Sequence, residues 1–435
     1  MAKGKKKENL TPEERLQAAL VPDWEQPYKV PKNWCWTYLK PISKIRTGKK
    51  DANYGSADGE YPFFTCAAEP IRCHGYSFDC NAILLAGNGD INNISRYNGK
   101  FEAYQRTYVV EILEPISIDY VFYWFKYRWF DFNKDKMFGT AIPYIRLGNL
   151  QEFPIPVPSV TQQQRIVDRI ESLFAKLDEA KQKAQDALDS FETRKAAILH
   201  KAFTGQLTPP WRKEHDVEME SWITVSVSEI CHSLKYGTAK KSESEGAVVV
   251  IRMGNLQDGE IDWSDLAYSN DKEDIEKYKL MPGDVLFNRT NSPALVGKTS
   301  IYRGEYPAIY AGYLIKLDYD HSRITGDYLN YSLNTISAKE YCNSVKTDGV
   351  NQSNINAKKI GAYKFAMPNI EEQTEIVRIL HDLLAKEQQA KEATEAVLEQ
   401  IDLIKKSILA RAFRGELGTN DPTEESAVEL MKEII

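Results

Sequence analysis

Residues 158–207 read PSVTQQQRIVDRIESLFAKLDEAKQKAQDALDSFETRKAAILHKAFTGQL, and residues 368–417 read PNIEEQTEIVRILHDLLAKEQQAKEATEAVLEQIDLIKKSILARAFRGEL. The two stretches align without a gap when the sequence is shifted by 210 residues. Identical residues recur along their whole length, from the leading proline to the final glycine and leucine. Self-similarity at a fixed shift indicates a duplicated architecture, so this repeat organises the interpretation of the whole chain.

Each stretch has the pattern of a long helix. Apolar residues alternate spacings of four and three, which is the seam of a coiled coil, with one lapse at Glu387. A proline precedes each helix and a glycine follows it, as helix starts and stops require. We therefore expect two antiparallel rods, each on the order of 60 Å long at 1.5 Å per residue. The predicted seam residues are Ile166, Ile170, Leu173, Leu177, Phe191, Ile198, Ile376, Leu380, Leu383, Val397, Ile401, Ile404 and Ile408.

A globular part precedes each rod. Trp34 aligns with Trp222 as the entry to each part, and alternating stretches such as RTYVVEI at 106–112 and GYLIKL at 312–317 predict strands. The predicted fold class is α+β, with two mixed α/β globular domains, two long antiparallel coiled-coil helices and a pseudo-two-fold internal repeat. The predicted domains are 1–157 (N-terminal helix and first globular domain), 158–207 (central helical spacer), 208–367 (second globular domain), 368–417 (distal helical spacer) and 418–435 (C-terminal tail helix).

Such an arrangement is suited to measuring a distance. Rods related by a pseudo-two-fold axis pack antiparallel and hold the globular domains at opposite ends. The two domains share little sequence outside their ends. Diverged domains on a common spacer favour recognition of two different short sequences at a fixed separation.

Composition limits the class of protein. A hydrophobic content of 42% is enough for two cores, and the chain has neither a membrane-spanning apolar run nor a signal-peptide h-region. We expect a cytoplasmic protein with no membrane contact. Cys66, Cys73 and Cys80 are too widely spaced for a zinc site, so no metal is expected.

The net charge of −6 is unusual for a nucleic-acid binder. Residues 366–435 hold 8 basic and 15 acidic side chains, so the acidity is concentrated away from the two globular domains. Neither domain is strongly basic, however. Tight DNA binding would therefore require a partner protein to supply positive charge.

Several motifs resemble the type I restriction-modification specificity subunits. The resemblance is strongest in FPIPVP at 153–158 with QQQRIV at 162–167, in EQTEIV at 372–377, and in the pair ILHKAFTGQL and ILARAFRGEL. The motifs IRMGNL at 251–256, MPGDVLFNR at 281–289 and LVGK at 295–298 resemble a target-recognition domain of this family. The stretches YPFF and AGNGD in the first domain resemble a different recognition-domain subtype.

The resemblance implies a mechanism. Each globular domain reads one half of an asymmetric, bipartite target in double-stranded DNA. The helices set the spacing and bind two adenine-N6 methyltransferase (M) subunits, through which motor-nuclease (R) subunits are recruited. The chain itself binds no cofactor, and S-adenosylmethionine and ATP belong to the partner subunits.

The sequence predicts no catalysis in this chain. It has no Asn/Asp-Pro-Pro-aromatic loop of an adenine methyltransferase. Residues 292–299 approach the phosphate-binding pattern GxxxxGK[ST], but Ser292 replaces the first glycine. Two alternatives stay open on sequence alone: a coiled-coil scaffold or adaptor without a DNA role, and a stand-alone enzyme.

Base recognition uses Arg, Lys, Asn and Gln side chains on elements that enter the major groove. Each of these residues is equally suited to a phosphate contact or a loop cap. The candidate DNA-binding residues are Asn88, Arg96, Gln105, Arg106 and Arg146 in the first domain, and Arg252, Arg289, Asn291, Lys298, Asn351 and Gln352 in the second.

Overall fold

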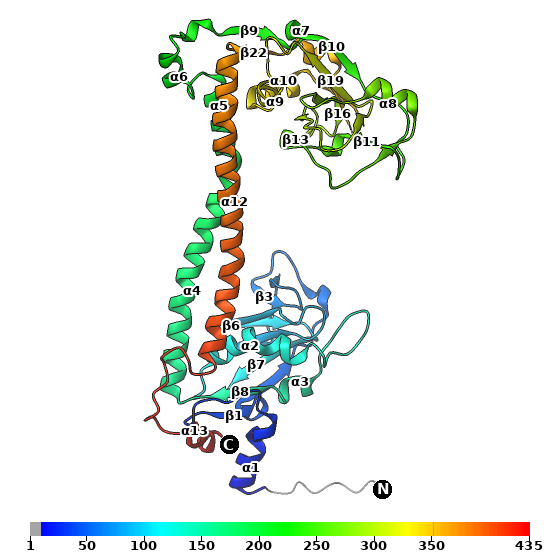
Figure 1. Cartoon of the computed structure of the whole chain (residues 1–435). Helices are drawn as coiled ribbons and strands as arrows, with labels where there is room; N and C mark the ends of the chain where they lie inside the picture. Colours follow the sequence, from blue (N-terminus) through cyan, green and yellow to red (C-terminus); the bar gives the residue numbers. More distant parts are fainter. Residues whose placement is uncertain (1–9, 351) are drawn as a thin grey trace. The chain divides into compact units, whose positions relative to one another are not determined.

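The computed structural model describes residues 10–350 and 352–435. It contains both helices and strands, which confirms the predicted mixed class (Figure 1). The chain divides into two compact units. Unit 1 runs to Ala184 and includes Ala396–Ile435, and unit 2 is Gln185–Glu395. Helices α4 (Val160–Asp189) and α12 (Ile370–Ala412) each begin in one unit and end in the other.

Unit 1 is built on a six-stranded sheet in the order β2-β7-β5-β6-β3-β4. Strand β3 runs parallel to β6, and the other neighbours are antiparallel. A separate antiparallel pair joins β1 to β8. The strands are β1 (Cys35–Tyr38), β2 (Ser43–Thr47), β3 (Tyr61–Phe64), β4 (Ile71–Cys73), β5 (Phe78–Ala86), β6 (Ile94–Ala103), β7 (Thr107–Ile112) and β8 (Pro154–Val157).

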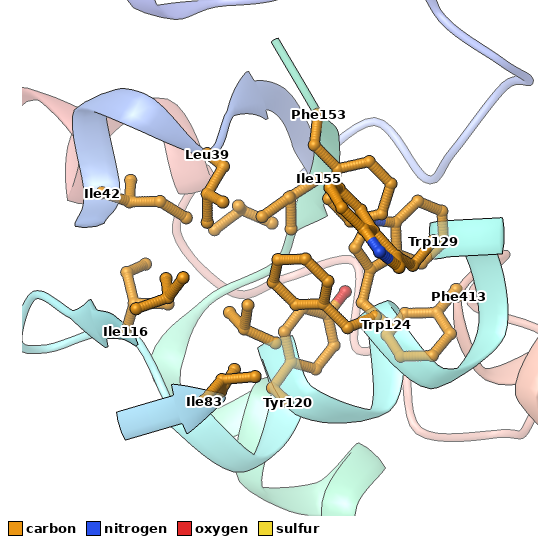
Figure 2. Packing of buried hydrophobic residues seen from close by; sticks show 14 of the residues in the cluster. Leu39, Ile42, Ile83, Ile116, Tyr120, Trp124, Trp129, Phe153, Ile155 and Phe413 are labelled. Carbon is orange, nitrogen blue, oxygen red and sulfur yellow. The ribbon is translucent and has the colours of Figure 1, made fainter. Parts of the chain in front are cut away.

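Helix α2 (Ile118–Asn133) supplies the aromatic centre of unit 1 (Figure 2). The side chain of Ser117 caps its first turn. Trp124 is fully buried, and its ring centroid lies 5.0 Å from that of Phe413, which follows α12. Burial of large aromatic side chains is a major source of core stability. The chain that follows α12 is therefore part of the core of the first globular domain.

The two terminal helices pack against this same core. The other helical segments of unit 1 are α1 (Pro12–Ala19), η1 (Asp23–Glu25), η2 (Lys40–Ile42), η3 (Ala52–Tyr54), α3 (Leu147–Gln151) and α13 (Ala427–Ile434). The guanidinium of Arg15 donates to the backbone carbonyl of Ile435, and Met431 of α13 is fully buried. The beginning and end of the described chain thus meet within unit 1.

Unit 2 contains smaller sheets. Their orders are β10-β19-β15-β17, β14-β11-β18 and β16-β21-β20, with the pairs β12-β13 and β22-β9. The strands are β9 (Ile223–Ser226), β10 (Cys231–Tyr236), β11 (Val248–Ile251), β12 (Leu256–Gln257), β13 (Glu260–Ile261), β14 (Tyr268–Ser269), β15 (Val285–Asn288), β16 (Thr290–Asn291), β17 (Thr299–Ile301), β18 (Ala308–Tyr310), β19 (Leu314–Tyr319), β20 (Thr347–Asp348), β21 (Ser353–Asn354) and β22 (Lys364–Met367). The helical segments are α5 (Phe191–Phe203), α6 (Pro209–Glu214), η4 (Met219–Ser221), α7 (Val227–Ile230), η5 (Met253–Asn255), α8 (Lys272–Tyr278), α9 (Gly326–Leu333), α10 (Ile336–Val345) and α11 (Ala357–Gly361).

The sheets of the two units have the same connectivity. Strands β10, β19 and β15 pair as β2, β7 and β5 do, and β11 lies parallel to β18 as β3 lies parallel to β6. The long strand β6 of unit 1 corresponds to two strands, β17 and β18, in unit 2. The break between β17 and β18 turns one six-stranded sheet into two smaller ones.

The entry to each domain is fixed in the same way. The Trp34 indole donates to the Gln162 side-chain oxygen at 3.1 Å, and the Trp222 indole donates to the Glu372 carboxylate at 2.9 Å. Gln162 and Glu372 occupy equivalent positions in the repeat. The structure thereby extends the sequence repeat into side-chain contacts.

Within each unit the long helices run antiparallel. In unit 1, Asp178 of α4 pairs with Lys405 of α12, and Lys181 pairs with Asp402 at 3.3 Å. Since the residue number rises on one helix while it falls on the other, the helices point in opposite directions. In unit 2, Arg194 of α5 pairs with Glu387 of α12 at 2.9 Å. This ion pair accounts for the lapse in the apolar pattern at Glu387.

The central helical spacer is broken at one residue. Helix α4 ends at Asp189 and α5 begins at Phe191. The hydroxyl of Ser190 donates to the backbone carbonyl of Ala187 at 2.7 Å. A serine hydroxyl that bonds to the backbone competes with the helical hydrogen-bond pattern, which explains the interruption. A single uninterrupted first rod was therefore a wrong expectation.

Most predicted seam residues lie in buried or partly buried positions. Val397 and Ile404 do not, because each is 44% exposed. Leu398 and Lys405 take the inner positions on this part of α12, both partly buried, and the Lys405 ammonium lies 5.0 Å from the ring centroid of Phe174. The structure places the remaining seam residues as follows: Ile166, Ile170, Phe191, Ile376, Leu380, Ile401 and Ile408 are buried, and Leu173, Leu177, Ile198 and Leu383 are partly buried.

Candidate nucleic-acid interface

In each unit, backbone hydrogen bonds join five chain segments at the ends of neighbouring strands. In unit 1 they are residues 47–51, 64–66, 86–88, 104–107 and 144–146, and in unit 2 they are residues 236–240, 251–253, 288–291, 311–314 and 354–356. We call these two sets the convergent edges of unit 1 and unit 2. Because segments from distant parts of the sequence meet there, each edge brings together side chains that no local motif would reveal.

Five backbone hydrogen bonds of one convergent edge have an equivalent in the other. In unit 1 they run from Tyr104 N to Phe64 O (2.9 Å), Thr107 N to Tyr104 O (2.8 Å), Gly87 N to Arg106 O (2.8 Å), Ile145 N to Gly87 O (2.9 Å) and Gly48 N to Thr107 O (3.2 Å). In unit 2 they run from Ala311 N to Ile251 O (3.0 Å), Leu314 N to Ala311 O (2.9 Å), Arg289 N to Tyr313 O (3.1 Å), Ile355 N to Arg289 O (2.8 Å) and Gly237 N to Leu314 O (3.4 Å). The two edges are thus the same backbone frame with different side chains.

A glycine is required at the same point of both frames. A Cβ on Gly48 would lie 1.9 Å from the backbone oxygen of Ala103. A Cβ on Gly237 would lie 2.1 Å from the backbone oxygen of Tyr310. No side chain fits such a close approach of two backbones. The strand that leads into the edge therefore crosses its neighbour at the same place in each unit.

Gln105 and Arg106 line a recess on the convergent edge of unit 1. The recess has a volume of about 320 Å³, and its other walls include Thr47 and Gly87. The Gln105 amide donates to the Asp51 carboxylate at 2.9 Å. The side chain of Arg106 is exposed and has no hydrogen bond or ion pair to another described residue. Its donors are therefore available to a ligand.

Asn88 and Arg146 lie on the same edge. Asn88 is partly buried and follows Gly87 directly. The guanidinium of Arg146 lies 3.8 Å from the ring centroid of Phe138 and 3.4 Å from the hydroxyl of Tyr144. A guanidinium stacked on a ring is held in a defined orientation. Four of the five candidates in the first domain are thus brought together.

Arg96 is the exception in the first domain. It lies on β6, and its guanidinium forms an ion pair with Asp119 on α2. Both side chains are about one-third exposed. This placement ties the sheet to a helix and leaves Arg96 outside the convergent edge.

On the convergent edge of unit 2, Arg289 is held by its surroundings. Its guanidinium donates to the Asn354 side chain at 3.2 Å and lies 4.8 Å from the ring centroid of Tyr236. Arg252 forms an ion pair with Asp265 at 2.8 Å. The Asn291 side-chain oxygen accepts a hydrogen bond from the backbone of the next residue. These three side chains are oriented, and each keeps unused hydrogen-bonding capacity.

The remaining candidates of the second domain differ in placement. Gln352 is exposed and immediately precedes β21, whereas Asn351 lies outside the described residues. Lys298 lines a groove of about 590 Å³ between the long helices and the second domain, within unit 2. Its ammonium donates to the Gln257 side chain at 2.7 Å. Lys298 is therefore on a different surface from Arg252, Arg289 and Asn291.

Sequence reasoning missed two tyrosines on the convergent edge of unit 2. Tyr236 is 41% exposed and stacks with Arg289. Tyr313 is partly buried against a cluster of buried residues that includes Ile251 and Tyr310. Both tyrosines adjoin a glycine, in the dipeptides Tyr236-Gly237 and Gly312-Tyr313. An aromatic residue beside a glycine at a strand end was the available signal.

Burial and nearby charge affect the aromatic side chains at both edges. Burial raises the pKa of Tyr108, which lines the recess beside the first edge, and the Arg106 guanidinium opposes this rise. Burial also raises the pKa of Tyr313 on the second edge, where Arg252 opposes it. Both hydroxyls are therefore protonated at neutral pH, so they are able to donate as well as accept hydrogen bonds.

The described residues contain no group of three or more His, Cys, Asp or Glu side chains that could hold a metal ion. No helix among them has both the length and the apolar character needed to cross a membrane.

Comparison with known proteins identifies the fold and the family. Residues 31–188 and 219–400 match the family model described as the type I restriction modification DNA specificity domain. The specificity subunit of the type I restriction enzyme EcoDI from Escherichia coli is 28% identical over 423 residues, covering 89% of this chain and 90% of that protein. The EcoKI specificity subunit of Escherichia coli strain K12 is 28% identical over 291 residues, covering 64% of this chain and 61% of that protein.

Two solved structures share the fold. One, from a study of complex assembly and conformational transition of the type I R-M system, has a TM-score of 0.68 at 19% identity and covers 90% of this chain and all of that chain. The HsdS subunit from Thermoanaerobacter tengcongensis has a TM-score of 0.60 at 19% identity, with the same coverage. The duplicated match of the family model follows the duplicated frame of the convergent edges, and it confirms the resemblance found in the sequence. The chain belongs to the family of type I restriction modification DNA specificity domains.

Proposed function

We propose that this chain is the DNA-reading, non-catalytic specificity subunit of a type I restriction-modification complex, and that each convergent edge reads one half of a bipartite target. The observation that carries this proposal is the repeated backbone frame. Five hydrogen bonds correspond between the edges, while the side chains that they present differ. A constant frame with variable side chains is what recognition of two unlike half-sites requires.

The chemistry of the edges suits base contacts. Arginine, asparagine and glutamine side chains match the acceptors and donors that bases present in the major groove. The edge of unit 1 offers Gln105, Arg106 and Arg146, and that of unit 2 offers Arg252 and Arg289. Neither edge is strongly basic, so a partner subunit supplies most of the phosphate contacts.

The partners follow from the same proposal. Double-stranded DNA is the ligand of the edges, and two adenine-N6 methyltransferase subunits bind along the helices and recruit motor-nuclease subunits. Val397, Leu403 and Ile404 support a partner on α12, because they are large apolar side chains with exposed fractions of 44%, 64% and 44%. Large apolar side chains that are exposed on one stretch of helix favour protein contacts. The subunit itself needs no cofactor, since S-adenosylmethionine and ATP are used by the partners.

The proposed function is tested by mapping N6-methyladenine across the genome of cells that express the chain with its cognate methyltransferase subunit. A second strain carries the same chain with residues 30–155 exchanged for those of a relative. A bipartite asymmetric motif, of which one half changes after the exchange, supports the proposal. The absence of any motif, with the methyltransferase folded and present, would overturn it and favour the scaffold interpretation.

A further inference from the structure

Arg106 and Tyr313 occupy the same position in the two convergent edges. Each is the last residue of the turn that leads into the next strand, β7 in unit 1 and β19 in unit 2. The backbone oxygen of Arg106 accepts from Gly87 N, and that of Tyr313 accepts from Arg289 N. Equivalent hydrogen bonds on both sides of the residue fix where each side chain leaves the backbone.

The polar groups of both side chains lack a partner among the described residues. No described residue forms a hydrogen bond or ion pair with the Arg106 guanidinium or with the Tyr313 hydroxyl. By contrast, Arg96 is paired with Asp119, and Lys298 donates to Gln257. A guanidinium and a hydroxyl without protein partners, at equivalent points of a duplicated frame, are available for a ligand.

The Arg106 guanidinium and the Tyr313 hydroxyl lie in different surroundings. Arg106 stands at the wall of the 320 Å³ recess, which gives its planar fork of donors room to approach a flat edge. The ring of Tyr313 packs beside Arg252 against the buried cluster that includes Ile251 and Tyr310, so its hydroxyl is held with little rotamer freedom. The first site offers a bidentate donor, and the second offers one group that both donates and accepts.

We infer that Arg106 and Tyr313 are equivalent specificity-determining residues, and that each contacts a base edge in its own half-site. The guanidinium of Arg106 selects a base with two adjacent acceptors, which is guanine in the major groove. The hydroxyl of Tyr313 contacts one base of the other half-site. This inference rests on the proposed function, because it assumes a bipartite target.

The test uses the full chain with its cognate methyltransferase subunit and compares Arg106→Ala with Tyr313→Phe. Both changes spare the fold, because Arg106 is exposed and phenylalanine keeps the packed ring. Each variant is mapped for N6-methyladenine, and its binding is measured on duplexes with single-base changes. Loss of a bidentate base contact, as expected for Arg106, reduces discrimination at one position by about 5- to 150-fold. Loss of the single hydrogen bond of the Tyr313 hydroxyl reduces it by about 2- to 13-fold.

The expected result is a relaxed guanine position in the half-site assigned to unit 1 for Arg106→Ala, and a relaxed position in the other half-site for Tyr313→Phe. Matched controls are Arg96→Ala and Tyr306→Phe, which remove the same chemical groups away from the edges and leave the motif unchanged. Tyr306 is 49% exposed and precedes β18, outside the five segments of the unit 2 edge. Unchanged base preference in either test variant, or a uniform weakening at all positions, would overturn the inference. Absence of a bipartite motif in the unaltered chain would instead overturn the proposed function.

Discussion

Replacement of Glu372 tests how the second domain is anchored to its helix. The Glu372 side chain is fully buried, and it accepts hydrogen bonds from Trp222 Nε1 at 2.9 Å, Arg212 Nη1 at 2.7 Å and Thr208 Oγ1 at 2.6 Å. Removing this carboxylate leaves Trp222 Nε1 and Thr208 Oγ1 without an acceptor. It also leaves the Arg212 guanidinium, whose side chain is only 11% exposed, without its counter-charge. Glu372→Ala is therefore expected to destabilise unit 2 by about 3–5 kcal/mol.

A double-mutant cycle separates the ion pair from the general loss of packing. Arg212→Ala also leaves a buried charge, because the Glu372 carboxylate then loses its cation. The double variant leaves neither charge unpaired, so its cost is smaller than the sum of the single costs by about 1–3 kcal/mol. Gln162→Ala in unit 1 is the matched control. Since Gln162 is neutral, its loss costs about 1–3 kcal/mol.

Hydrogen exchange measured by mass spectrometry is the suitable assay, because two units need not unfold together. Backbone amides in residues 205–222 report on the anchor in unit 2, and amides in residues 35–38 report on unit 1. A change of less than about 1 kcal/mol in Glu372→Ala, or strict additivity in the cycle, would refute the reasoning.

Three further substitutions or measurements follow from the structure. Gly48→Ala and Gly237→Ala each force a methyl group into a backbone oxygen, and either is expected to lower the free energy of unfolding of its unit by about 1–3 kcal/mol, measured by hydrogen exchange. Ile401→Ala is expected to cost about 2–5 kcal/mol because the side chain is buried, whereas Ile404→Ala changes stability by less than about 0.5 kcal/mol because it is exposed; equal costs would contradict the observed register. Burial raises the pKa of the Cys35 thiol to about 12, so this thiol stays protonated at pH 8 and resists alkylation until the protein is unfolded in urea; labelling of the native protein would contradict this prediction.

The repeat was the feature that sequence predicted best. Trp34 and Trp222 were aligned on residue type alone, and the structure places both indoles against the equivalent residues Gln162 and Glu372. This succeeded because an indole next to a long polar side chain needs a hydrogen-bond partner when it is buried. Each half of the sequence therefore has a tryptophan at its entry and a hydrogen-bond acceptor at the equivalent helix position.

The inner face of α12 was predicted less well. Apolar residue type selected Val397 and Ile404, but the structure turns Leu398 and Lys405 inward. A lysine takes an inner position because its long apolar stem packs while its charge pairs with Asp178. Residue type alone does not contain this information, because the partner lies on a helix more than 200 residues away.

Tertiary contacts also decide which candidate DNA-binding residues are paired inside the protein and which are not. Arg96 and Arg106 have the same side chain and lie ten residues apart, yet one is paired with Asp119 and the other is free. Which arginine is free depends on where α2 packs on the sheet. Composition identifies arginines as candidates, and only the tertiary contacts separate an internal ion pair from an available donor.

The convergent edges also explain how two domains with little shared sequence perform the same task. Their corresponding hydrogen bonds are made by backbone atoms, so they place few demands on residue type except at Gly48 and Gly237, where a Cβ does not fit. Substitutions at Arg106 or Tyr313 therefore leave the frame intact and change only the group that it presents. Under the proposed function, such a frame would allow the target to change one base contact at a time without any change in the helices.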